Sequence, residues 1–223
     1  MERHEFLPIK RLTRLAVIPA ILFVAVAATL GTARAELVPT PSLPPEMAVP
    51  RDISAETDND LARTAGRAGS ADGVLLLLSG RVLDGAGREM ADARVEIWHA
   101  DAQGRKPGED QTADQNFQGY GRSETGGDGR FGFRTIRPGT AAGRAPHIHV
   151  RIAAPGYGAM TTQIFFAGEK DNDRDPVLGS VRDPAARARL IVPLEQAADA
   201  EGVGVTFSAA FDIVLGFNRS APA

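Results

Sequence analysis

Residues 144–150 read Arg144-Ala145-Pro146-His147-Ile148-His149-Val150, and the rest of the chain is organised around this stretch. Side chains of a β-strand alternate between its two faces, so a strand here places His147 and His149 on the same face. Two neighbouring imidazoles suit a borderline metal such as Fe, Zn or Cu. Arg144 adds a fixed positive charge that suits an anionic ligand. The alternative is a strand with two hydrogen-bonded structural histidines, because two ligands do not complete a metal site.

The front of the chain has the three-part layout of a secretory signal peptide. Residues 1–14 are basic, residues 15–31 are apolar and uncharged, and small residues stand at Ala33 and Ala35. We therefore predict residues 1–35 as a signal peptide cleaved after Ala35, and export to the periplasm or the cell exterior. An uncleaved N-terminal anchor is the alternative, since the apolar run is only a little shorter than the ~20 residues that span a bilayer.

The composition limits the class of protein and of partner. The chain has no cysteine, so its core has to be stable without disulfides. About 190 residues follow the predicted leader, which is enough for one domain with a sizeable core. The formal net charge is −3 and the sequence has no basic stripe, so nucleic-acid binding is unsupported.

Short strands separated by turn signals dominate the rest of the sequence. Apolar or alternating runs predict strands over residues 74–83, 93–98, 130–136, 147–153, 160–166 and 205–217. One short helix is predicted over residues 185–190, with Asp183 as its N-cap and Pro184 at its first position, and a helical turn over residues 58–67. This pattern predicts an all-β sandwich over residues 74–217, preceded by a proline-rich arm, 36–73, and followed by a tail, 218–223.

Several motifs occur in the order that a known family has. They are Leu78–Asp84, Ala93–Arg105, Phe117–Arg122, Phe133–Gly139, Pro146–His149 and Thr162–Phe166. Over roughly residues 75–216 the chain resembles the intradiol ring-cleavage dioxygenases, the group of protocatechuate 3,4-dioxygenase and catechol 1,2-dioxygenase. The resemblance implies a β-sandwich with one non-haem Fe(III), which uses O2 to open a catechol- or protocatechuate-like ring between its two hydroxyls.

The resemblance also assigns site residues. The family holds its iron through two histidines and two tyrosines, and the two histidines match His147 and His149. A family arginine that stabilises negative charge developing on the substrate matches Arg144. A family glutamine near the ring being cleaved matches Gln163. The resemblance further implies a homo-oligomer or a partner subunit of a hetero-oligomer.

The two tyrosine positions of the family hold other residues in this chain. Lys106 stands where the first tyrosine is expected, and Thr140 and Ala141 stand where the second is expected. The only tyrosines of the chain, Tyr120 and Tyr157, match neither position. A protonated lysine has no lone pair to donate, so the sequence predicts a site without either phenolate ligand.

Other residues near these positions are the candidates for replacing the phenolates. A carboxylate added to two imidazoles would suit Fe(II), Zn or Cu. The candidates are three carboxylates, a third imidazole and the two tyrosines: Asp101, Glu109, Asp110, His99, Tyr120 and Tyr157. If it is not a ligand, the histidine is expected to cap a surface edge of its strand, and the tyrosines are expected to pack. Residues 171–175 resemble part of a calcium loop but lack its glycine and distal glutamate, so they are predicted to form a solvated turn.

Three functions follow from these observations. The first is an exported dioxygenase whose remaining iron ligands have been rebuilt. The second is a catalytically degenerate relative that binds an aromatic or serves as a partner subunit. The third is a histidine-based metal-binding or scaffolding module of the cell envelope. The fold alone does not distinguish them, so the site has to.

Overall fold

The structure is a computed structural model, and it describes residues 36–45, 58–141, 143–198, 202 and 204–216. The predicted signal peptide and tail lie outside the described residues. Among the described residues, no helix has the length and apolar character needed to cross a membrane.

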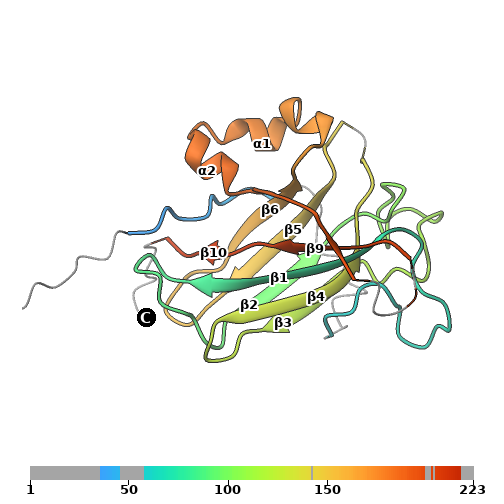
Figure 1. The fold of residues 1–223 in the computed structure, drawn as a ribbon, viewed down its shortest axis with the longest axis horizontal. Coiled ribbons are helices and arrows are strands. Elements are labelled where there is room, and N and C mark those ends of the chain that lie inside the picture. Colours follow the sequence, from blue (N-terminus) through green and yellow to red (C-terminus); the bar gives the residue numbers. More distant parts are fainter. Residues whose placement is uncertain (1–35, 46–57, 142, 199–201, 203, 217–223) are drawn as a thin grey trace, which may run out of the picture. The chain divides into compact units, whose positions relative to one another are not determined.

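Two five-stranded sheets form the domain (Figure 1). In the first sheet β1 (Leu75–Leu83) pairs with β4 (Arg130–Ile136), β9 (Thr206–Ala210) and β10 (Ile213–Val214), and β8 (Glu195–Ala197) pairs with β9. The second sheet has the order β3 (Tyr120–Glu124), β2 (Arg94–Trp98), β5 (His147–Ala153), β6 (Met160–Phe166) and β7 (Ile191–Val192). The prediction of an all-β sandwich is confirmed.

Five of the six predicted strands are confirmed to within one residue at each end, as β1, β2, β4, β5 and β6. The sixth, over residues 205–217, is split into β9 and β10. Asp212 lies in the gap and accepts hydrogen bonds from the Arg81 backbone N and Nη2, at 2.9 and 2.8 Å. The chain passes so close to β1 here that a Cβ on Gly80 would lie 2.0 Å from the Phe211 carbonyl oxygen. The side-chain pairing therefore replaces the sheet hydrogen bonds at this point.

The prediction of one short helix is wrong, because the described residues hold two short α-helices and one 3-10 helix. The predicted helix is α2 (Pro184–Ala188), capped by Asp183 as expected. The other two are η1 (Lys170–Asp173), which takes up part of the predicted solvated turn, and α1 (Pro176–Ser180), which follows that turn. The helical turn expected over residues 58–67 is absent: these residues form turns and a bridge between Asp60 and Arg134.

The proline-rich residues 36–45 run extended from the first sheet to the second. Thr40 bonds through its backbone N and its hydroxyl to Val214 of β10. Leu43 bonds through its backbone N and carbonyl to Thr161 of β6. This arm therefore connects β10 to the edge of the sheet that carries the histidines.

Alternation along the second sheet separates a core face from an outer face. Ile97, Ile148 and Ile164 are fully buried in the hydrophobic core. Trp98, His149 and Gln163 are register neighbours on β2, β5 and β6, so their side chains share the opposite face. These outer residues are also buried, with exposed fractions of 1%, 2% and 0%. The outer face of the second sheet therefore holds a covered row of polar side chains.

Candidate metal and ligand site

His147 and His149 converge on the outer face of the second sheet. Their Nε2 atoms lie 3.2 Å apart, and their rings are nearly perpendicular, at 78°. Two nitrogens that each lie ~2.0–2.1 Å from one metal are 3.2 Å apart when the N–metal–N angle is about 100°. The spacing of this two-histidine site therefore suits neighbouring positions around a tetrahedral or octahedral cation.

Both imidazoles are held in the neutral form that binds metals. The His147 Nδ1–H donates to the Ala145 carbonyl at 2.7 Å, which leaves the lone pair on Nε2. Burial lowers the pKa of His147. Burial, followed by the charges of neighbours that include Arg144 and Lys106, lowers the pKa of His149 to about 2. At neutral pH neither ring therefore carries a positive charge that would oppose a metal.

Trp98 fixes the plane of the His149 ring. The two rings are stacked, with centroids 5.2 Å apart and planes 8° from parallel. The His149 Nδ1 is buried and has no hydrogen-bond partner among the described residues. Stacking and the contact at Nε2 therefore set the position of this ring, rather than a second-shell hydrogen bond of the kind that many metal-binding histidines have.

Arg144 and Gln163 lie beside the two-histidine site and contact each other. The Arg144 Nη2 donates to the Gln163 Oε1 at 2.7 Å, and the Arg144 Nε donates to the Asp175 Oδ2 at 2.8 Å. Gln163 also donates through Nε2 to the Pro44 carbonyl at 3.2 Å. The structure thus brings together all four residues that the resemblance assigned, and adds Asp175, which the sequence did not indicate.

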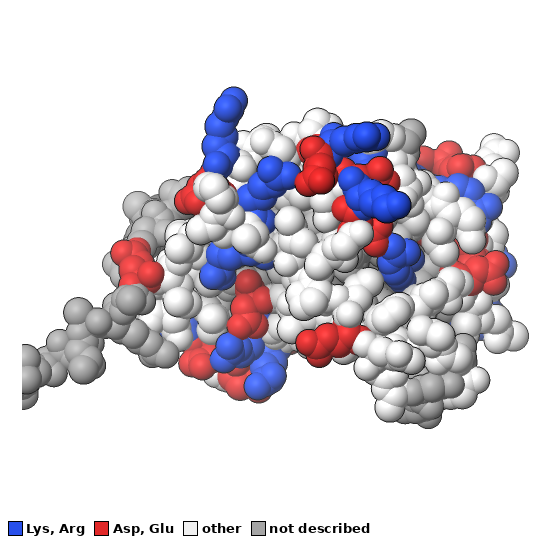
Figure 2. Space-filling view, turned by 45° about the horizontal axis from the view of Figure 1, so that its top comes forward, with Lys and Arg blue, Asp and Glu red and all other residues white. Residues whose placement is uncertain are grey.

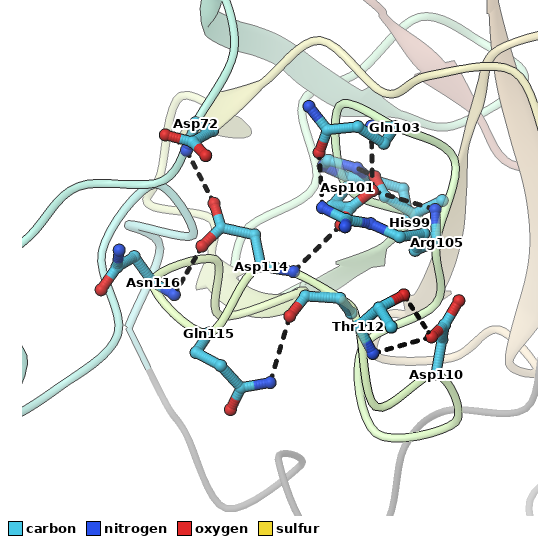
Figure 3. Close-up of polar contacts among 12 residues, drawn as sticks. Asp72, His99, Asp101, Gln103, Arg105, Asp110, Thr112, Asp114, Gln115 and Asn116 are labelled. Atoms are coloured by element: carbon cyan, nitrogen blue, oxygen red, sulfur yellow. Dashed lines mark hydrogen bonds and ion pairs between the residues drawn. The ribbon is translucent and has the colours of Figure 1, made fainter.

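Asp101 and Asp110, two of the candidate carboxylates, accept hydrogen bonds from other residues. Asp101 is buried and accepts hydrogen bonds from Gln103 N, Arg105 N and Nε, and Asp114 N (Figure 3). Asp110 accepts from the backbone and hydroxyl of Thr112 in the same loop. Among the described residues, no group of three or more His, Asp or Glu is placed to hold a metal.

Glu109 is paired with the lysine that stands at the first tyrosine position. The Lys106 Nζ lies 3.4 Å from the Glu109 Oε2. The loops that carry the two altered positions touch, since Gly139 N donates to the Asp101 carbonyl at 2.9 Å. A Cβ on Gly104, which has φ +78°, would lie 2.1 Å from the Thr140 carbonyl oxygen. The two loops therefore pack closely against each other at their glycines, but neither loop carries a phenolate.

Neither tyrosine replaces the missing ligands. The Tyr120 hydroxyl donates to the Glu96 Oε1 at 2.7 Å, and Arg151 donates to the other oxygen of the same carboxylate. Burial and this hydrogen bond raise the pKa of Tyr120, which opposes formation of a phenolate. Tyr157 lies in the turn between β5 and β6 and lines a cavity of about 310 Å³ with Thr40 and other residues. The packing roles expected as alternatives fit both residues.

His99 is a structural histidine, and the expectation that it caps a surface edge is wrong. It is 1% exposed, because it follows Trp98 and so projects to the other side of the chain. Its Nδ1–H donates to the Ala100 carbonyl, and its Nε2 accepts from the Thr135 hydroxyl, both at 2.7 Å. With both ring nitrogens occupied, His99 has no lone pair for a metal.

The burial of His99 predicts a loss of stability in acid. Burial lowers the pKa of His99 to about 4, from 6.5 for an exposed imidazole. Between pH 7 and pH 4 the unfolded chain binds a proton there that the folded chain does not, so folding loses roughly 3 kcal/mol as the pH falls. Urea unfolding of the metal-free protein across this range should show a shallower pH slope for His99→Gln than for the unaltered chain. Equal slopes would contradict the assignment.

The residues present fit a cation held by two neutral imidazoles. They do not fit an Fe(III) centre with two histidines and two tyrosines, because both tyrosines of the chain lie in other contacts. After burial, cationic Arg144 and Lys106 lower the pKa of both histidines, while the carboxylate of Asp175 acts in the opposite direction on His147. A metal here would need anionic ligands from outside the described residues.

The face of the domain drawn in Figure 2 carries charged side chains of both signs. Lysine and arginine side chains lie interspersed with aspartate and glutamate side chains there, among the residues that the structure describes. Nucleic-acid binding typically needs a basic patch or stripe.

Comparisons with known proteins match most of the chain. A family model described as dioxygenase matches residues 49–216. The protocatechuate 3,4-dioxygenase beta chain of Burkholderia cepacia is 34% identical over 177 residues, which are 74% of each chain. The alpha chain from the same organism is 40% identical over 128 residues, 55% of this chain and 64% of that one. The dioxygenase domain of a carbohydrate-binding fusion from Streptomyces sp. SirexAA-E aligns with a TM-score of 0.61 and 32% identity, over 80% of this chain and 99% of that one.

Proposed function

Because the chain belongs to the intradiol ring-cleavage dioxygenases, we propose that it binds a catechol-type aromatic at the two-histidine site and opens the ring with O2. Relatives are named for protocatechuate, catechol and hydroxyquinol, which all carry neighbouring hydroxyls. The observation that carries the proposal is the convergence of the two Nε2 atoms beside Arg144 and Gln163.

The metal is the part of the proposal that departs from the family. The family typically uses non-haem Fe(III), whose role is to activate the bound aromatic toward O2. Two neutral imidazoles suit Fe(II), Zn or Cu better than Fe(III), and the two oxygens of a catecholate are the anionic donors that the described residues lack. We therefore assign His147 and His149 as the protein ligands.

The remaining residues of the site would bind and orient the aromatic. Arg144 carries a charge that cannot be lost by deprotonation at ordinary pH, so it suits an anionic ligand. Gln163 offers an amide between the arginine and the arm. Trp98 forms an aromatic wall behind His149. Residues 1–35 lead us to propose export, and the relatives named as alpha and beta chains lead us to propose an oligomer.

A second function is favoured by one observation, the loss of both phenolate positions. Lys106, Thr140 and Ala141 replace the tyrosines that hold iron in the family, and no described side chain takes their place. A chain of this kind would bind the aromatic, or support a partner chain, without turning the aromatic over.

Metal content and O2 uptake of the purified chain separate these functions. The protein would be analysed for bound metal as isolated, then loaded with Fe(II), Zn(II) or Cu(II) and titrated with catechol and protocatechuate. O2 uptake matched by a ring-opened diacid supports the dioxygenase. Binding of metal and aromatic without O2 uptake supports the second function. A chain that binds neither metal nor aromatic overturns the dioxygenase and the aromatic-binding role, and leaves only the support of a partner chain.

A further inference from the structure

We infer that Asp175 is the positioning residue for Arg144, fixing where the guanidinium meets an anionic ligand at the two-histidine site. The role in ligand binding rests on the proposed function, whereas the positioning itself does not. Asp175 lies 31 residues from Arg144 in the sequence, in a charged run that looked like a solvated turn. In the structure its side chain is 0% exposed, and that of Arg144 is 11% exposed.

The two carboxylate oxygens of Asp175 have separate partners. Oδ1 accepts from Val177 N and Leu178 N, at 3.0 and 2.9 Å, and so caps α1. Oδ2 accepts from Arg144 Nε and Ala145 N, at 2.8 and 2.9 Å. One buried anion therefore joins the start of a helix to the segment that leads into the histidine strand.

The guanidinium is also held at its Nη2 atom. Arg144 Nη2 donates to the Gln163 Oε1, and the Gln163 Nε2 donates to the carbonyl of Pro44. The proline carbonyl can only accept, so it sets which end of the amide faces the arginine. Contacts at Nε and Nη2 together fix both the position and the rotation of the planar group.

Positioning explains this arrangement better than stability does. A buried ion pair is weak evidence for stability, because desolvation offsets the attraction between the charges. An arginine side chain loses rotamer entropy when it is ordered, and prior fixation removes that cost from ligand binding. A preorganised charge is also the form in which a cation best stabilises charge on a bound anion.

The substitution Asp175→Asn distinguishes the roles of the two carboxylate oxygens. Asparagine keeps an oxygen for the helix cap but turns an NH2 group toward two donors, Arg144 Nε–H and Ala145 N–H. The matched control is Asp183→Asn, because Asp183 caps α2 in the same Asp-Pro setting through Ala185 N at 2.9 Å. Both variants should retain cooperative unfolding, so a difference between them reports the contacts of Asp175 Oδ2 with Arg144 and Ala145.

The first readout is the Arg144 Nε–H signal in 15N NMR of the full chain, which needs no ligand. We expect an ordered, slowly exchanging Nε–H in the unaltered chain and in Asp183→Asn, and a mobile one in Asp175→Asn. An ordered signal that persists in Asp175→Asn would overturn the inference, whatever the protein binds.

The second readout is the affinity for catechol of the Fe(II)-loaded protein, measured by calorimetry without O2. Asp175→Asn should bind catechol roughly tenfold more weakly, Asp183→Asn should match the unaltered chain, and Asp175→Asn should add nothing in an Arg144→Met background. A further loss in that background would mean that Asp175 does not act through Arg144. If the unaltered chain binds no catechol, the proposed function fails, and the NMR result alone decides the positioning.

Discussion

His149→Phe is expected to abolish metal binding while leaving the fold intact. Phenylalanine keeps an aromatic ring for the stack on Trp98, but it has no nitrogen to place 3.2 Å from His147 Nε2. Loss of a second-shell partner alone typically costs 10–100-fold in metal affinity, so loss of one of two protein ligands should cost more than about 100-fold. Titration with Co(II), followed by its visible absorption, measures the affinity directly.

The control for this variant is the structural histidine. His99→Gln should bind Co(II) as the unaltered chain does and should lose stability at pH 7, because both nitrogens of His99 serve buried hydrogen bonds. The two variants should therefore have different effects: His149→Phe loses the metal, and His99→Gln loses stability. If His149→Phe still bound one Co(II) per chain with unchanged affinity, the pair on β5 would not be the metal site.

The pairing of His147 and His149 could be predicted from the sequence because it depends only on the alternation of one strand. The strand was confirmed over residues 147–153, and a register neighbour on each side then fixes which face the histidines share. That the two histidines share a face needed no tertiary information, whereas the identity of that face did. The same reasoning gave five strands to within a residue.

The features that the sequence did not predict depend on pairing between residues far apart in the chain. Asp175 follows Asp171 and Asp173 in a run that is typical of solvent, yet its partner Arg144 lies 31 residues earlier and draws it into the interior. Asp212 splits a strand because it pairs with Arg81, 131 residues away. His99 is buried where its Nε2 meets the hydroxyl of Thr135, 36 residues away. Each of these polar side chains takes its role from a partner that local patterning does not reveal.

Lys106→Tyr is expected to give the protein an Fe(III) site with a broad phenolate-to-iron absorption in the visible. The positive charge of Lys106 acts on both histidines, since it contributes to lowering the pKa of each after burial does. Replacing it with tyrosine removes a cation that repels the metal and adds an anionic oxygen donor. We expect Fe(III) affinity, measured by competition with a chelator, to rise at least about tenfold.

Lys106→Phe separates the two effects of that substitution. It removes the charge without adding an oxygen, so it should raise Fe(III) affinity slightly and give no visible band. If Lys106→Tyr matched Lys106→Phe in both respects, the loop after Gly104 would not reach the metal, and the loss of phenolates would not follow from this position. A band in the tyrosine variant alone would mean that the loop geometry of the family persists around Lys106. The difference between this chain and its iron-binding relatives would then lie in side-chain chemistry rather than in the fold.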